Sequence, residues 1–241
     1  APIQRLTLAS GQYLDFSYEA GKVSKITDCA GRSVQYEYDG DLLTAVTYPN
    51  GGTMRYQYDT RGLIISVTDQ NGINYLVNSY DEKGRVIRQD LANGEEHVFL
   101  YNDSRRQTTY HNLQSGRSTV YHYNDQKQAV KTEYDDGTYQ EFEYDQWGNR
   151  ILEKNRSGEI TRWTYRQDGK LVRQELPSGL IWEFEYDDRG NQVHWWNNDG
   201  EEFFAQFDER NNCVREEQVI DAMRRRVQTY QYDRLGRMIS M

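Results

Sequence analysis

Two pairs of glutamates have the spacing that could perform hydrolytic chemistry. Glu141 and Glu143, and likewise Glu183 and Glu185, stand two residues apart, so each pair shares one face of a β-strand. Glycosidases use two such carboxylates as acid and base or nucleophile. Here, however, each pair alternates with aromatic residues and returns with a repeat. We therefore interpret these glutamates as a solvated polar face and predict that the chain is not an enzyme.

Histidines and cysteines could hold a metal or activate a nucleophile. The four histidines, His97, His111, His122 and His194, fall at no ligand spacing. Cys29 and Cys213 lie far apart, and neither belongs to a C-x-x-C or zinc pattern. No Ser-His-Asp or glycine-rich phosphate signature is present in the sequence. We predict no catalytic residue, no metal site and no cofactor.

An aromatic cluster, Trp182, His194, Trp195 and Trp196, is the most unusual local feature. Exposed rings on β-repeats can stack on sugars, as in choline-binding and other cell-wall-binding modules. Alternatively, the rings thicken a hydrophobic seam between neighbouring repeats. A sugar-binding or adhesive array therefore remains an alternative function for the chain.

Composition narrows the class of protein. The 241 residues are 36% hydrophobic with a mean hydropathy of -1.00, yet 13% are aromatic, which predicts an ordered object with little interior. The net charge of -9 disfavours nucleic acid as a partner, because phosphate binding needs basic patches. The run Arg224–Arg226 is short and isolated, so we interpret it as a solvated loop. No apolar run is long enough to span a bilayer.

A repeat of 20 to 22 residues explains most of the sequence, with one longer step of 25 residues at its end. Its anchor is an aromatic residue at Tyr18, Tyr38, Tyr58, Tyr80, Tyr101, Tyr123, Tyr144, Tyr165, Tyr186, Phe207 and Tyr232. A second landmark of the same period is a glycine at Gly11, Gly31, Gly51, Gly72, Gly94, Gly116, Gly137, Gly158, Gly179 and Gly200. An Asx or Ser residue precedes nearly all of these glycines, which indicates a hairpin turn.

A first turn follows each anchor. Asp or Asn usually comes directly after the aromatic residue, where its side chain can accept a bond from the backbone two residues on. A glycine such as Gly62, Gly148 or Gly190 closes this turn, and we expect it to have a positive φ. Arg105 and Lys127 replace that glycine, so we expect two looser turns.

Between the turns the residues alternate between aromatic and polar, with a second aromatic residue two positions before most anchors. A period of two indicates a β-strand with two different faces. We predict an all-β fold: an antiparallel meander of about eleven hairpins over residues 1–241, in one continuous array. Open twisted sheets of many strands curl, so the strip should be a curved, spiralling single sheet.

The repeated stretches "YQYDTRGLI", "FEYDQWGNRI", "FEYDDRGNQV" and "YQYDRLGRMI" resemble the YD-repeat, or Rhs-repeat, family. That family includes bacterial Rhs polymorphic toxins, the BC component of Tc toxins, wall-associated proteins and teneurins. The resemblance implies a hollow shell whose wall encloses a C-terminal toxin or carries other cargo, in a secreted or cell-surface protein. No Asp-Pro dipeptide is present, so no autoproteolytic residue is carried over. The residues that match the repeat are Tyr38, Asp39, Tyr58, Asp59, Gly62, Tyr80, Asp81, Gly84, Tyr144, Asp145, Gly148, Tyr186, Asp187, Gly190, Tyr232, Asp233 and Gly236.

The ends of the sequence suggest a fragment of a longer protein. Unpaired strand edges near Gly11 and Gly236 should then favour edge-to-edge self-association. The long step after Phe207 lacks an Asx-Gly turn, so we expect the weakest strand pairing there. Phe203 and Phe204 are adjacent in one strand and should point to opposite faces.

Overall fold

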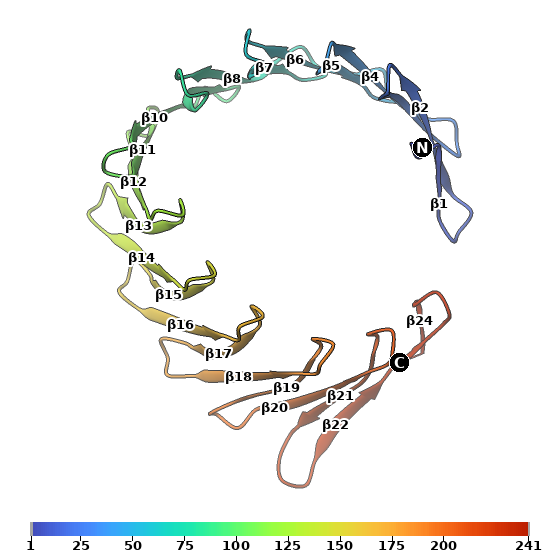
Figure 1. Ribbon diagram of the computed structural model, residues 1–241, viewed down its shortest axis with the longest axis vertical. Coiled ribbons are helices and arrows are strands. Elements are labelled where there is room, and N and C mark those ends of the chain that lie inside the picture. The colour runs from blue at the N-terminus through green and yellow to red at the C-terminus, as the bar shows by residue number, and fades with distance from the viewer. Residues whose placement is uncertain (1, 241) are drawn as a thin grey trace. The chain divides into compact units, whose positions relative to one another are not determined.

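The computed structural model describes residues 2–240, and this part of the chain is all-β. It contains twenty-four strands and no helix within those residues (Figure 1). In the main sheet, successive strands pair antiparallel with their neighbours in the sequence, as the alternating sequence predicts. The prediction of an antiparallel meander of hairpins is confirmed.

The chain divides into two compact units, with the boundary between Val120 and Tyr121. In the first unit the strands follow one another along a curve (Figure 1). The strands of the first unit are β1 (Arg5–Thr7), β2 (Tyr13–Glu19), β3 (Lys22–Asp28), β4 (Ser33–Asp39), β5 (Leu42–Thr47), β6 (Thr53–Tyr58), β7 (Ile64–Thr68), β8 (Asn74–Tyr80), β9 (Val86–Leu91), β10 (Glu96–Asn102) and β11 (Gln107–Asn112).

The second unit repeats the same plan. Strand β12 (Ser118–Tyr123) contains the boundary. The last hairpin forms a separate two-stranded sheet. The strands of the second unit are β13 (Ala129–Tyr134), β14 (Tyr139–Tyr144), β15 (Arg150–Lys154), β16 (Ile160–Tyr165), β17 (Leu171–Glu175), β18 (Ile181–Tyr186), β19 (Gln192–Asn197), β20 (Glu202–Phe207), β21 (Cys213–Val219), β22 (Arg225–Thr229), β23 (Gln231–Tyr232) and β24 (Met238–Ser240).

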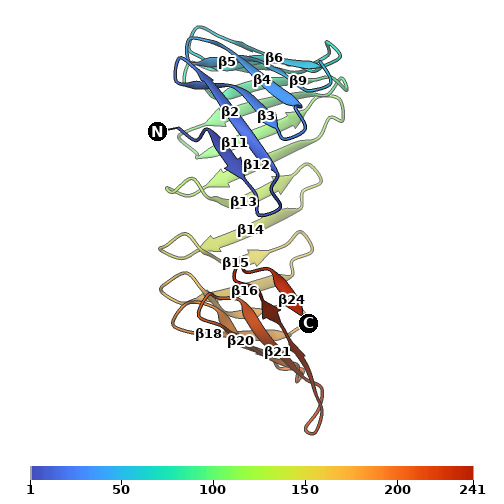
Figure 2. The same cartoon turned by 90° about the vertical axis from the view of Figure 1, so that its right-hand side faces the viewer.

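Each unit is a single layer of strands, and its interior is correspondingly small (Figure 2). The buried apolar side chains in the described residues are only Ala45, Val46, Val67 and Ala205. Val46 pairs opposite Tyr36 and Ala45 opposite Glu37, so the buried residues lie on both faces. Neighbouring side chains of the same sheet, rather than a second layer, therefore provide most of the burial.

The turns use the left-handed backbone region, as the glycine pattern predicts. Gly62, Gly148 and Gly190 have φ values of 79°, 89° and 88°, and Asn211 has a φ of 64°. Only a residue without a Cβ, or an Asn, enters this region at low cost.

The expectation of a looser turn at Lys127 is wrong. Lys127 itself adopts a φ of 62°, and its backbone makes the same bond as the glycines do, 3.0 Å from its nitrogen to the Asn124 carbonyl. At the other exception, Arg106 rather than Arg105 has the positive φ, of 52°. The β10–β11 hairpin there pairs up to Asn102 and Gln107 without the register shift of other repeats. This turn therefore differs by a shift of one position rather than by loss of pairing.

The long step after Phe207 is also better paired than its sequence suggests. Strands β21 and β22 pair at five positions, from Arg215 with Thr229 to Val219 with Arg225. Two arginines of the basic run thus lie in a strand, because extra residues lengthen the hairpin instead of opening it. Weak pairing is confined to the two registered pairs of β23 and β24.

Candidate functional site

The anchor tyrosines connect each repeat to the one before it. In seven repeats, the tyrosine hydroxyl donates a hydrogen bond to a main-chain carbonyl 15 or 16 residues earlier. The oxygen–oxygen distance is 2.7 Å from Tyr58 to Leu43 and 2.9 Å from Tyr186 to Leu171. The other donors and acceptors are Tyr18 to Ile3, Tyr38 to Val23, Tyr80 to Ile64, Tyr101 to Val86 and Tyr144 to Ala129. We call these bonds the tyrosine stitches.

A β-bulge explains why a carbonyl is available for each stitch. In the hairpin before Tyr58, Tyr38 pairs with Leu43 and Glu37 with Ala45, so Thr44 is an extra residue. The ladder from β5 to the next strand stops at the pair Ala45–Arg55. Leu43, two residues beyond that pair, has no ladder partner on that side. The Tyr58 hydroxyl supplies the missing donor.

Four of the eleven anchors make no stitch among the described bonds, and two of them, Phe207 and Tyr165, serve as natural controls. Phe207 occupies the anchor position without a hydroxyl, fifteen residues after Gln192, which begins β19. Tyr165 has a hydroxyl, but among the described residues it donates no hydrogen bond to a carbonyl. The stitch is therefore a common property of the repeat but not an obligatory one.

An aspartate or asparagine directly after most anchors closes the first turn through its side chain. One carboxylate oxygen of Asp59 accepts from the backbone N–H groups of Arg61, at 2.9 Å, and Leu63, at 3.0 Å. The backbone of Asp59 also bonds to Leu63, and Gly62 donates to the Asp59 carbonyl. The same pair of side-chain bonds is made by Asp81, Asn124, Asp145, Asp187, Asp208 and Asp233.

These contacts shift the ionisation of the aspartates. The N–H of Leu63, followed by Arg61, holds the pKa of Asp59 below its usual value. For Asp187, the Asn191 side-chain amide and then its backbone N–H lower the pKa in the same way. The turn is therefore built for an ionised carboxylate.

Sequence reasoning missed part of the second turn. In some repeats the residue three before the glycine makes the same side-chain bonds, as Asp69 does to Asn71 and Ile73. In others the residue directly before the glycine bonds to the backbone two residues on, as Asn50 does to Gly52. An Asx three residues before the glycine was the signal that could have indicated the first arrangement.

One glutamate of each pair, Glu141 and Glu183, forms an ion pair with a basic side chain of the sheet. Glu183 accepts from Arg173 at 2.5 Å, and Lys154 lies 3.4 Å from Glu141. Glu185 lies 3.3 Å from a ring nitrogen of His194. Such pairs on a half-exposed strand face fit the interpretation as a polar face.

The aromatic cluster is divided between the two faces of the sheet. On one face Trp195 stacks on Phe203, with ring centroids 5.3 Å apart. On the other face His194 stacks between Trp196 and Phe204, at 4.4 and 4.3 Å. Phe203 and Phe204 thus point to opposite faces, as their adjacency predicts. The rings pack against protein rings on both sides of the sheet.

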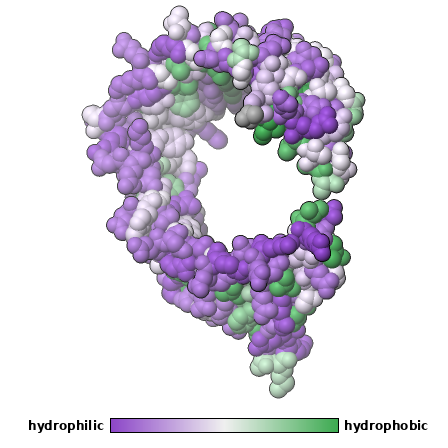
Figure 3. All heavy atoms as spheres, turned by 45° about the vertical axis from the view of Figure 1, so that its right-hand side comes forward, coloured by the Kyte–Doolittle hydropathy of each residue, from purple (hydrophilic) through white to green (hydrophobic). Residues whose placement is uncertain are grey.

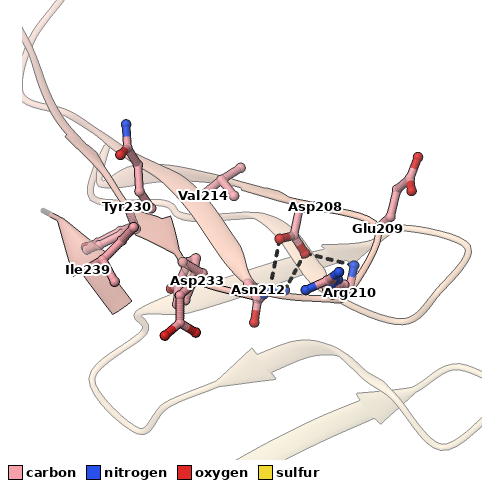
Figure 4. Close-up of a pocket in the computed structure, with 10 residues that line it drawn as sticks. Asp208, Glu209, Arg210, Asn212, Val214, Tyr230, Asp233 and Ile239 are labelled. Atoms are coloured by element: carbon pink, nitrogen blue, oxygen red, sulfur yellow. Dashed lines mark hydrogen bonds between the residues drawn. The ribbon is translucent and has the colours of Figure 1, made fainter. Parts of the chain in front are cut away.

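One hollow of the second unit lies beside its last hairpin (Figure 4). It encloses about 590 Å³ between the β20–β21 turn and strands β23 and β24. Asp208 bonds within its own turn to Arg210 and Asn212, and Glu209 points away from the other lining residues (Figure 4). The hollow therefore has no convergent free carboxylates.

Tyr230, which also lines this hollow, is tied down as well. Its hydroxyl donates to Glu216 at 2.6 Å, and that carboxylate raises the pKa of Tyr230 to about 12. Tyr232 pairs with Met238 in the small sheet and lines the same hollow.

Within residues 2–240, no group of three or more His, Cys, Asp or Glu side chains is arranged to hold a metal ion. The same residues include no helix that is long and apolar enough to cross a bilayer.

One known protein family matches part of this repeat. The RHS Repeat family matches residues 18–53 and 40–73, which include two complete tyrosine stitches, Tyr38 to Val23 and Tyr58 to Leu43. This part of the chain, residues 18–73, is similar to RHS repeats. No curated protein matches its sequence.

Several solved structures are similar to this chain. They include the crystal structure of TcdB2-TccC3-Cdc42, with 12% identity and a TM-score of 0.46, and that of TcdB2-TccC3, with 11% identity and a TM-score of 0.45. Another is the Tc holotoxin pore of Photorhabdus luminescens with a TccC3 mutation, with 13% identity and a TM-score of 0.34. Each match covers 95% of this chain but only 19 or 20% of the other chain.

Proposed function

We propose that this chain is a non-enzymatic length of RHS-repeat wall that encloses or carries cargo, such as a C-terminal toxin, for its parent protein. The main support for this proposal is the set of tyrosine stitches. Each stitch joins a hairpin to its predecessor by the same local rule, so the strip can be lengthened without new contacts having to be designed. A wall needs this property, whereas a catalytic site needs a unique constellation of residues.

The two faces of the sheet support a role in separating two compartments. One face carries the anchor tyrosines and their aromatic neighbours, and the other carries ion pairs such as Arg173 with Glu183. Neither face has a second layer to cover it. The partners would be the rest of the parent protein and its cargo, in a secreted or cell-surface setting. Nucleic acid would not be a partner, because the net charge of -9 repels phosphates.

Protease protection of the parent polypeptide tests the proposal. We expect the cargo segment to resist a protease while the RHS repeats are folded, and to be cut when they are unfolded by denaturant. Replacing Tyr38, Tyr58 and Tyr80 with Phe should raise the rate of cutting. Tyr75→Phe is a matched control, because Tyr75 lies in the same sheet and its hydroxyl makes no stitch.

Two results would refute this function. One is cargo cleavage that is equally fast in the native and the denatured protein. The other is selective retention of the chain by cell-wall polysaccharide, with loss of retention in Trp182, Trp195 or Trp196 variants. That second result would establish the sugar-binding alternative instead.

A further inference from the structure

The hairpin of β21 and β22 is longer than the repeat requires. In the repeat of Tyr58, the second turn begins with Asp69, eleven residues after the anchor. After Phe207 the strand continues to Val219, and the turn is made by the bond from Ile220 to Arg224. The first strand of this hairpin thus gains two residues, or roughly 7 Å at about 3.3 Å per residue. Figure 1 shows this loop reaching beyond the neighbouring loops.

The tip of this hairpin exposes two large apolar side chains. We define the basic tip as residues 220–227. Met223 is 96% exposed, the highest value among the large hydrophobic side chains, and Ile220 is 46% exposed. The outermost atoms at the lower end of Figure 3 are correspondingly pale green against a purple surface. A side chain that is held almost entirely in water gains free energy from any apolar environment it can enter.

Positive charge surrounds these apolar side chains. Arg224 pairs with Asp221 at 2.6 Å, and Arg225 pairs with Glu217. Arg226 forms no ion pair with any residue that the structure describes. With Asp221 as its one acidic residue, the basic tip has a formal charge of +2 in a chain whose total is -9.

We propose that the basic tip is a docking site for an anionic lipid surface. Met223 and Ile220 would enter the boundary between headgroups and acyl chains, while Arg224 and Arg226 contact lipid phosphates. A convex tip with an exposed apolar end can insert into a deformable lipid surface, whereas a protein partner would need a groove that matches the shape of the tip.

The acidic remainder of the chain does not prevent this docking. Repulsion between exposed charges is screened within about 8 Å at physiological ionic strength. The extra length of the hairpin is close to that distance, so the tip meets the lipid before the acidic body does. This inference is independent of the proposed wall function, because it concerns a loop that the repeat does not need.

Vesicle co-sedimentation of the complete chain tests the inference. We expect the chain to bind vesicles of phosphatidylcholine mixed with phosphatidylglycerol, and not vesicles of phosphatidylcholine alone. Arg224→Gln with Arg226→Gln should weaken binding about 25-fold, because each arginine near an anionic surface contributes about fivefold. Ile220→Ser with Met223→Ser should weaken it about tenfold or more, from lost apolar burial.

Two control variants keep the outcome specific. Arg234→Gln removes an exposed arginine of the neighbouring last hairpin, and Leu113→Ser removes an apolar side chain that is 52% exposed elsewhere. Both should bind within about twofold of the original chain, which is the scale of an ordinary surface substitution. Circular dichroism should show the same β-content in every variant.

Three results would overturn the assignment. They are equal vesicle binding by the original chain and the double arginine variant, no binding to anionic vesicles at low salt, and binding to a polyglutamate peptide without binding to vesicles. The last result would assign the basic tip to an acidic protein segment instead.

Discussion

Replacing Tyr58 with Phe isolates one tyrosine stitch. The substitution keeps the ring, which packs on the face of β6, and removes only the hydroxyl that lies 2.7 Å from the Leu43 carbonyl. A hydrogen bond of this kind contributes a net free energy of roughly 0.5–1.5 kcal/mol to folding. The Leu43 carbonyl lies beyond the last ladder pair, Ala45–Arg55, so no neighbouring donor replaces the lost one. We therefore expect a local loss of about 1 kcal/mol.

Hydrogen exchange of the native chain measures this loss where it occurs. A decrease of about 1 kcal/mol in the free energy of opening lowers amide protection about fivefold. The effect should be confined to β5, β6 and the hairpins beside them, because stability in a repeat array is a sum of neighbour contacts. Amides of β14 and β15, in the other unit, should exchange at their original rates.

Tyr165→Phe is the matched control for this prediction. It removes the hydroxyl of an anchor tyrosine that forms no stitch in the described part of the chain, so protection should change by much less than fivefold. If Tyr58→Phe leaves protection unchanged, or if both substitutions have equal effects, the stitch does not contribute as the geometry indicates.

The remaining predictions concern other positions of the repeat. Phe207→Tyr should raise amide protection in β19 and β20 by about fivefold, because the new hydroxyl would donate to the Gln192 carbonyl, which lies beyond the last β19–β20 pair. Unchanged protection would contradict this expectation. Gly148 and Lys127 both have a positive φ, which glycine adopts at the lowest cost. Gly148→Val should therefore destabilise its hairpin by roughly 1–2 kcal/mol, and Lys127→Gly should stabilise its own hairpin. Denaturation midpoints of the two variants that do not move in opposite directions would refute this explanation of the turns. The ionised Asp187 carboxylate should stabilise its turn fully above the unfolded aspartate pKa of about 3.9, and this stabilisation should be lost as pH falls through the lowered folded pKa. Asp187→Asn should remove this part of the acid sensitivity of amide protection in hydrogen exchange. The free edges of the terminal strands should make the isolated chain self-associate, so sedimentation that shows only monomer at high concentration and moderate salt would exclude that interaction.

Most of the fold could be predicted because its determinants are local. A positive φ at Gly62 and the alternation through Tyr56, Gln57 and Tyr58 are properties of a few consecutive residues. Those properties indicate hairpins wherever they occur, and the repeat supplies many independent copies. The identity of the fold class needed no information about contacts between distant residues.

The stitch could not be predicted from the same pattern. It depends on a bulge that displaces one residue of the previous hairpin, such as Thr44, and on the end of the ladder at Ala45. Neither feature has a residue type of its own, since Thr44 is equivalent to Ile65 in the next repeat. The register that creates the free carbonyl therefore becomes visible only when the strands are paired.

The hairpin after Phe207 shows a second limit of sequence reasoning. The absence of an Asx-Gly pair indicated weak pairing, but the bond from Ile220 to Arg224 closes an alternative turn, and Asp221 accepts from Met223 and Arg224. A turn can thus be closed by another arrangement of side-chain and backbone bonds.

The adjacency of tyrosine and aspartate in the repeat follows from two different requirements. The anchor tyrosine bonds backward, to a carbonyl of the preceding hairpin, as Tyr80 does to Ile64. The next residue bonds forward, to the turn of its own hairpin, as Asp81 does to Lys83 and Arg85. One dipeptide therefore fixes both the contact between repeats and the turn within a repeat. Residues on the two faces, including His194 and its stacked rings, can vary without disturbing either bond.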